Sequence, residues 1–185
     1  GPDVKMDIVE TPATIVSGNA INGSTMKGLK IRTNLNSDES VGIWFGTNGS
    51  HWSGISGQRK NSSTTWGTNL SFYTHENATN NLTYARERMT IDSEGNVGIG
   101  TSSPNSLAHI YGGSSGRTWT PDGSDKLALE NSDSVSLDIR TPSSNQGAIL
   151  FSDANARARG ILAYSHASDL MYFNTAGSER MRITS

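Results

Sequence analysis

The chain has 185 residues, a formal net charge of −2 and no cysteine, so disulfide bonds and thiolate metal sites are excluded. It contains no run of about 18 apolar residues and therefore no transmembrane helix. Its near-neutral charge argues against a dedicated nucleic-acid-binding protein. Ser, Thr, Asn and Gly supply 81 residues, whereas Leu, Ile, Val and Phe supply 34. Since so few large apolar side chains must offset the conformational entropy lost on folding, we expect a thin core that other copies of the chain complete.

The chain divides in sequence order into a leader, two β-rich modules and a linker. Residues 1–28 hold one apolar patch among turn-forming residues and predict an extended N-terminal connector. Residues 29–111 predict the first β module, residues 112–126 a Gly/Ser-rich linker, and residues 127–185 a second, truncated module. No long segment has the helical period of 3.6 residues, so the predicted fold class is all-β.

Alternation of apolar and polar residues predicts the strands. Val135, Leu137 and Ile139 alternate with polar residues, the period of two that is typical of a strand with one buried face. The segments 89–91 and 97–99 alternate in the same way. We expect other copies of the chain to cover the apolar side chains that a single module leaves exposed to solvent.

A hairpin turn is predicted between these last two segments, at Asp92–Asn96. Asp and Ser side chains can bond to the turn backbone, and Gly95 can adopt a positive φ. Gly98 and Gly100 then leave one face of the next strand without side chains. This pattern predicts the close approach of another backbone, for which a neighbouring chain is one candidate.

Five blocks of the first module recur in the same order in the second, which indicates tandem copies of one module. The matched blocks are LKIRT (29–33) with LDIRT (137–141), GIWF (42–45) with AILF (148–151), GIS (54–56) with GIL (160–162), LSFYT (70–74) with LMYFNT (170–175), and ERMTIDS (87–93) with ERMRITS (179–185). The second copy stops where the first continues with EGNVGIGT. We therefore expect either a fragment of a longer polypeptide or a partner strand supplied by another chain.

The segment ERMTIDSEGNVGIGTSSPNSLAHI, Glu87–Ile110, resembles a motif of bacteriophage tail fibres and tailspike-type proteins. The shared element is R-M-x-I-x-x-x-G-N-V-G-I-G-T-x-x-P followed by a short Leu/Ile strand. In that family it often lies upstream of an intramolecular chaperone domain of the endosialidase class. The resemblance implies tandem β-rich modules in an elongated homotrimeric fibre.

The same resemblance implies a structural and host-attachment role in the tail fibre of the virion. The implied partners are two further copies of the chain, neighbouring fibre segments, and a host cell-surface glycan or other receptor. Neither nucleic acid nor membrane insertion is expected. Two alternatives stay open, the non-catalytic stem of a glycan-degrading tailspike and a stand-alone lectin-like carbohydrate-binding module.

No enzyme, cofactor or metal site is predicted. The sequence contains no G-x-S-x-G element, P-loop, H-E-x-x-H or Rossmann fingerprint. Asp122 and Asp125 could bind calcium in a loop, although an Asx-turn explains them more simply. The pairs Glu87-Arg88 and Glu179-Arg180 predict ion pairs between strands or between chains.

The first module differs from the second by extra residues between Gly54 and Glu87, in a region rich in aromatic side chains. Aromatic rings can stack on sugar rings while nearby amides and hydroxyls bond the sugar hydroxyls. Packing of the same rings over a thin core is the alternative. The candidate glycan-binding residues are His51, Trp52, Trp66, Tyr73 and His75.

Overall fold

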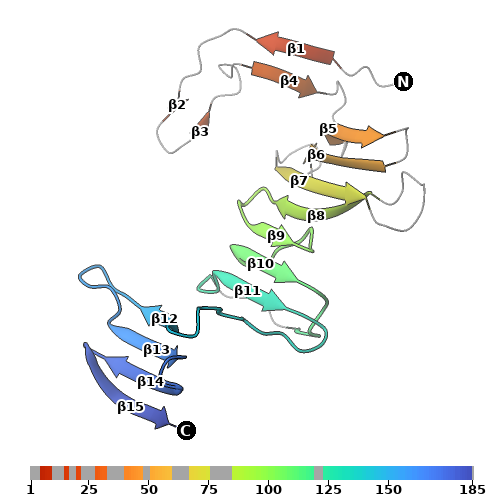
Figure 1. The fold of residues 1–185 in the computed structure, drawn as a ribbon. Helices are drawn as coiled ribbons and strands as arrows, with labels where there is room; N and C mark the ends of the chain where they lie inside the picture. The colour runs from red at the N-terminus through yellow and green to blue at the C-terminus, as the bar shows by residue number, and fades with distance from the viewer. Residues whose placement is uncertain are drawn as a thin grey trace. The chain divides into compact units, whose positions relative to one another are not determined.

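The computed structural model describes residues 5–9, 15–16, 20–21, 28–32, 40–47, 51–59, 67–75, 85–118 and 123–184. Within these ranges the chain forms strands, turns and bends but no helix, which confirms the predicted all-β class. No helix that could cross a membrane is therefore found in these ranges. The chain divides into two units, residues 1–135 and residues 136–185 (Figure 1).

Two short antiparallel ladders lie at the start of the first unit. β1 (Lys5–Val9) pairs with β4 (Gly28–Arg32), and β2 (Ile15–Val16) pairs with β3 (Ala20–Ile21). β4 is most of the LKIRT block. The leader is thus more than an extended connector, because it supplies the strand to which this block pairs.

The main sheet of the first unit has seven strands that lie side by side in chain order (Figure 1). β5 to β9 form an antiparallel meander, and β9, β10 and β11 are parallel. The bounds are β5 (Ser40–Thr47), β6 (His51–Arg59), β7 (Thr68–His75), β8 (Ala85–Ile91), β9 (Val97–Ile99), β10 (Ala108–Tyr111) and β11 (Leu127–Glu130). β11, which the sequence boundary assigned to the second module, thus extends the sheet of the first.

The predicted hairpin turn between β8 and β9 is confirmed. Oδ1 of Asp92 accepts hydrogen bonds from the backbone N–H groups of Glu94 and Asn96, at 3.0 and 2.8 Å. Gly95 has a φ of 85°, a left-handed conformation that residues with a side chain rarely adopt. The turn residues therefore fix the register in which Met89 pairs with Ile99.

Close backbone approach at Gly98 and Gly100 is also confirmed, but the neighbour is the chain itself. A Cβ atom at Gly98 would collide with the carbonyl oxygen of Thr101, and one at Gly100 with that of Tyr111. Gly100 also has a φ of 79°. The two glycines let the loop after β9 fold over the sheet before the chain returns as β10.

The second unit holds one antiparallel sheet with the order β12-β13-β14-β15 (Figure 1). Its strands are β12 (Gln146–Phe151), β13 (Gly160–Ser165), β14 (Leu170–Thr175) and β15 (Ser178–Thr184). The prediction of a strand at Val135–Ile139 is wrong. Residues 131–145 join no ladder, and the side chains of Val135, Leu137 and Ile139 are exposed. Alternation favours a strand, but a strand also needs a neighbour whose backbone groups can bond to it.

Candidate functional site

Two rows of apolar residues cross one face of the seven-stranded sheet. Directly paired residues project from the same face, so the ladder registers define each row. The first row is Ile43, Ile55, Phe72, Met89, Ile99, Ile110 and Leu129, and the second is Val41, Gly57, Leu70, Ile91, Val97, Ala108 and Leu127. We call these fourteen residues the apolar face of the first sheet.

This apolar face is exposed. Ile99 keeps 46% of its surface accessible, and Ile43, Ile55, Leu70, Ile110 and Leu127 are similarly open. The opposite face carries the row Gly42, Ser56, Ser71, Thr90, Gly98, His109 and Ala128, of which the serines and Thr90 are almost fully buried. Burial is therefore reversed from the usual pattern, in which the apolar face lies inside.

The sheet of the second unit repeats the pairing pattern of β5 to β8. Its corresponding rows are Ile149, Leu162, Phe173 and Met181, and Gly147, Tyr164, Met171 and Ile183. Several of these side chains, including Ile149 and Met181, are also exposed. Leu162 stands where Ile55 stands in the first sheet, one residue later than the match of GIS with GIL indicates.

An arginine forms a β-bulge at the same place in both sheets. Arg88 is the extra residue between the pairs Phe72–Met89 and Tyr73–Glu87, and Arg180 is its counterpart in β15. Nε of Arg88 donates to Oγ1 of Thr74 at 2.9 Å, and Nε of Arg180 donates to Oγ1 of Thr175 at 3.0 Å.

The acids beside these arginines make other contacts. Glu179 forms a two-bond ion pair with Arg182 at 2.8 Å, and this pairing lowers the pKa of the Glu179 carboxyl. Glu87 accepts a hydrogen bond from the hydroxyl of Tyr73 at 3.3 Å. The Glu179–Arg182 pair lies within β15, and the contact of Glu87 is a hydrogen bond with a tyrosine, so neither is the ion pair between strands or between chains that the sequence predicted.

An aromatic pair lies on the sheet face opposite the apolar face. The rings of Trp44 and Tyr73 are 5.3 Å apart and tilted by 49°. They come together over Gly54, where a Cβ atom would collide with the indole of Trp44. Trp44 is 42% exposed, and Glu87 lies beside Tyr73. The pair offers one open aromatic surface next to a carboxylate.

Of the five predicted glycan-binding residues, only Tyr73 is placed in this pair. His75 lies at the end of β7, is half-buried and pairs with Ala85. His51 and Trp52 begin β6, where their backbones pair with Thr47 and Gly46. Trp66 lies outside the described residues. Trp44 was not among the predicted binding residues, although a Gly opposite a Trp on paired strands is a signal for a ring packed flat on the sheet.

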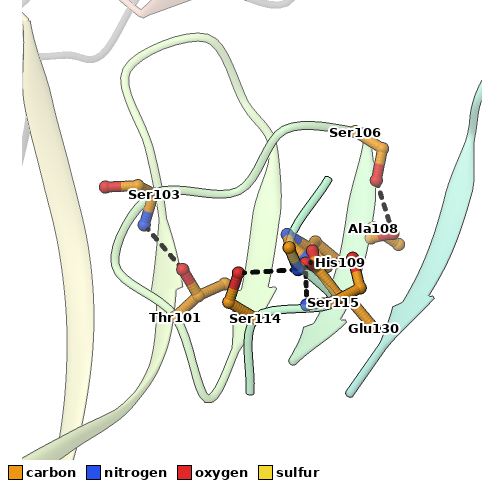
Figure 2. Close-up of polar contacts among 9 residues, drawn as sticks. Thr101, Ser103, Ser106, Ala108, His109, Ser114, Ser115 and Glu130 are labelled. Carbon is orange, nitrogen blue, oxygen red and sulfur yellow. Dashed lines mark hydrogen bonds and ion pairs between the residues drawn. The ribbon is translucent and has the colours of Figure 1, made fainter. Parts of the chain in front are cut away.

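A buried histidine joins β10 to β11 on the polar face. Nε2 of His109 lies 3.1 Å from Oε2 of Glu130, and the histidine is 3% exposed. Figure 2 shows Ser115 beside them. The backbone N–H and the hydroxyl of Ser115 both donate to Oε1 of Glu130, at 2.9 and 2.8 Å, and these bonds lower the pKa of Glu130.

This cluster is suited to fastening the loop and not to nucleophilic chemistry. A serine nucleophile needs its hydroxyl bonded to a base, whereas the hydroxyl of Ser115 is bonded to the carboxylate. The approach of Nε2 of His109 to Glu130 lacks hydrogen-bond geometry, and in the described ranges Nδ1 makes no hydrogen bond either. Within the same ranges, no three His, Asp or Glu side chains gather as a metal site would require. Asp122 of the suggested calcium loop lies outside them.

We compared the chain with known protein families, sequences and structures. No protein-family model, no curated protein sequence and no solved structure matches the chain.

Proposed function

We propose that the chain is a two-module segment of a homotrimeric bacteriophage tail fibre or related adhesin, with a role in structural extension and host attachment. On this proposal it is a component of the virion, located in the tail fibre. Its partners are two copies of itself, neighbouring fibre segments and a receptor on the host cell. We assign no catalytic step to it.

The observation that carries the proposal is the exposed apolar face. Seven strands spaced about 4.8 Å apart make a face roughly 29 Å wide, along which two rows hold only apolar side chains and glycine. Large contiguous apolar patches on soluble proteins mark interaction surfaces. A single chain has too few large apolar side chains to build a thick core. An assembly that covers this face would bury its apolar side chains and so form a shared core.

Recurrence of the pattern favours copies of the same chain as the partner. Both sheets carry an apolar row of the same kind, with a Phe paired to a Met and a bulged Arg beside it. We take the two sheets as copies of one module. A partner that covers the apolar rows of both sheets must itself carry two matching modules. A second copy of the chain has them. The resemblance of Glu87–Ile110 to tail-fibre sequences specifies three chains.

Light scattering tests the proposal by the mass in solution. We expect three times the chain mass of 19.7 kDa. A particle of one chain, stable at micromolar concentration, would contradict the homotrimer and with it the fibre.

A glycan-binding role for the first module is the second candidate, and the partly exposed Trp44 ring beside Tyr73 and Glu87 favours it. A ring of this kind can stack on a sugar while the carboxylate accepts a hydroxyl. The alternatives of a tailspike stem and a stand-alone lectin share this chemistry. They differ in assembly, because a lectin module would be stable as a monomer.

Binding to a panel of bacterial surface polysaccharides tests this second role. Trp52→Ala and Trp66→Ala should weaken binding and leave the mass in solution unchanged, and Trp44→Ala tests the observed pair. Loss of assembly in these variants would instead identify the rings as packing groups. Full retention of polysaccharide binding in all three would remove the aromatic residues from the proposal.

A further inference from the structure

The last strand of the second sheet, β15, matches β8 of the first sheet pair by pair. Both strands make three successive pairs with the strand before them and then a β-bulge at an arginine. The corresponding pairs are Leu70–Ile91 and Met171–Ile183, Ser71–Thr90 and Tyr172–Arg182, and Phe72–Met89 and Phe173–Met181. The outer edges of β8 and β15 are therefore equivalent.

In the first sheet this edge is occupied by β9. Residues Val97–Ile99 run antiparallel to Met89–Ile91, with Gly98 opposite Thr90 (Figure 1). In the second sheet the strand order ends at β15, which pairs with β14 alone among the residues that the structure describes. The edge that β9 fills in one module thus has no counterpart strand in the described part of the other.

The difference is visible in the exposure of matching side chains. Met181 and Ile183 are each 51% exposed, whereas Met89 and Ile91 at the corresponding positions of β8 are half-buried. All seven residues of β15 are exposed, but only two of the seven residues of β8 are. A strand beside β15 would cover side chains of the kind that β9 and its flanking loops cover beside β8.

The backbone groups that such a strand would meet are those of Arg182. Pairs in an antiparallel ladder alternate between those that exchange hydrogen bonds and those that do not. In the first sheet the N–H groups of Asp92 and Gly100 donate across the ladder, each at 2.9 Å, so Thr90, which lies midway between these two bonds, exchanges bonds with Gly98. By the shared register, the N–H and carbonyl of Arg182 point away from β14 toward the outer edge.

The first sheet also specifies the kind of strand that fits. β9 places two apolar side chains on the apolar face, and the glycine between them leaves the other face open. An open position suits the place opposite Arg182, whose long side chain is paired with Glu179. The charges of β15 do not bar a strand, because β8 carries Arg86 and Arg88 and is paired on both edges.

A second copy of the chain cannot supply its own β9 for this purpose. That strand is already paired with β8 on one edge and with β10 on the other, so its release would break two ladders. The occupant that fits is a strand of the same chemistry from a segment outside residues 1–185.

We propose that the outer edge of β15 accepts an antiparallel strand of the type apolar-Gly-apolar, which adds a fifth strand to the second sheet by β-augmentation. Its glycine lies opposite Arg182, and its apolar residues lie opposite Met181 and Ile183. The added ladder satisfies the free backbone groups of the edge and covers the two exposed apolar side chains. This inference goes beyond the fibre role and does not depend on how many chains the particle contains.

A chain extended after Ser185 tests the edge. The extension EGNVGIGT repeats the eight residues that follow Ser93 in the first module. The matched control, EGNVPIGT, keeps both apolar residues but places proline opposite Arg182. Proline has no N–H to donate to the ladder, so this extension should not pair.

Hydrogen exchange at the N–H of Arg182 reports the pairing. In the parent chain it should exchange at least about tenfold faster than the N–H of Thr90, which is already paired with β9, because a strand hydrogen bond must open before its amide exchanges. The EGNVGIGT extension should slow Arg182 at least about tenfold, and EGNVPIGT should leave it fast. The N–H groups of Met181 and Ile183, which face β14, should stay slow in all three chains and show that the sheet is intact.

Each other outcome overturns the proposal. Slow exchange at Arg182 in the parent means that another segment or another copy of the chain already fills the edge. Equal exchange at Arg182 in the two extended chains means that the added segment does not pair there. Either result leaves the proposed fibre standing, because the mass in solution tests that proposal separately.

Discussion

The apolar face makes a sharp prediction for Ile99→Lys. Ile99 lies in the middle of the first apolar row, between Met89 and Ile110, and is 46% exposed in the single chain. The lysine can reach solvent there, so the fold of one chain should survive. In the proposed trimer, however, another copy of the chain covers the same position.

The magnitude follows from this exposure. Full burial of an isoleucine side chain is worth about 1.5–3 kcal/mol, so covering the exposed half contributes roughly 1 kcal/mol per chain. An unpaired charge held in the interface costs on the order of 3–5 kcal/mol. A loss of about 4 kcal/mol for each chain weakens association roughly a thousandfold for each substituted chain. At micromolar concentration the variant should be monomeric.

Sedimentation or light scattering reads the mass, and far-ultraviolet circular dichroism checks that the strands remain. Leu107→Lys is the matched control, because Leu107 is 53% exposed but lies in the loop before β10, outside both rows. It should stay assembled. If Ile99→Lys keeps the mass of the parent, the apolar face is not where the chains meet.

The remaining predictions concern the fold that holds these faces. Gly98→Ala should lower the free energy of unfolding by about 1–3 kcal/mol, since its Cβ atom would collide with the backbone of Thr101 and force a shift. Gly123→Ala is the control: it has open space around it and should change the denaturant midpoint little. Equal midpoints would refute the close approach. Because the bonds from Ser115 lower the pKa of Glu130 from its ordinary 4.5, its carboxylate stabilises the fold above about pH 4.5, and this contribution disappears as the pH falls through the lowered pKa. The stability difference between the parent and Glu130→Gln should therefore narrow on acidification, and a difference that is constant with pH would count against the assignment.

Local sequence determined the elements that depend on local chemistry. The Asp92–Asn96 turn follows from an acid that can bond the turn backbone and a glycine that tolerates positive φ. Alternation also identified the strands 89–91 and 97–99. The small residues at Gly98 and Gly100 indicated close backbone contact. These signals are short-range, so a reader of the sequence can find them without knowing the fold.

Three features depended on tertiary contacts that no local pattern encodes. Alternation at Leu137 and Ile139 predicts a strand, but only the spatial neighbours decide whether a ladder forms, and here none does. β11 belongs to the first sheet because its backbone pairs in parallel with that of β10, a contact between segments that the loop 112–126 separates in the sequence. Trp44 and Tyr73 meet because β5, β6 and β7 place them around Gly54.

Composition and alternation by themselves determined that the chain is β-rich, short of large apolar side chains, and built from strands with one apolar face. Only the tertiary structure decided that the face buried within the chain is the one with Ser56, Ser71 and Thr90, while the apolar rows are left open. The physical reason is that a period of two separates the faces of a strand but does not say which face a loop, a sheet or another chain will cover.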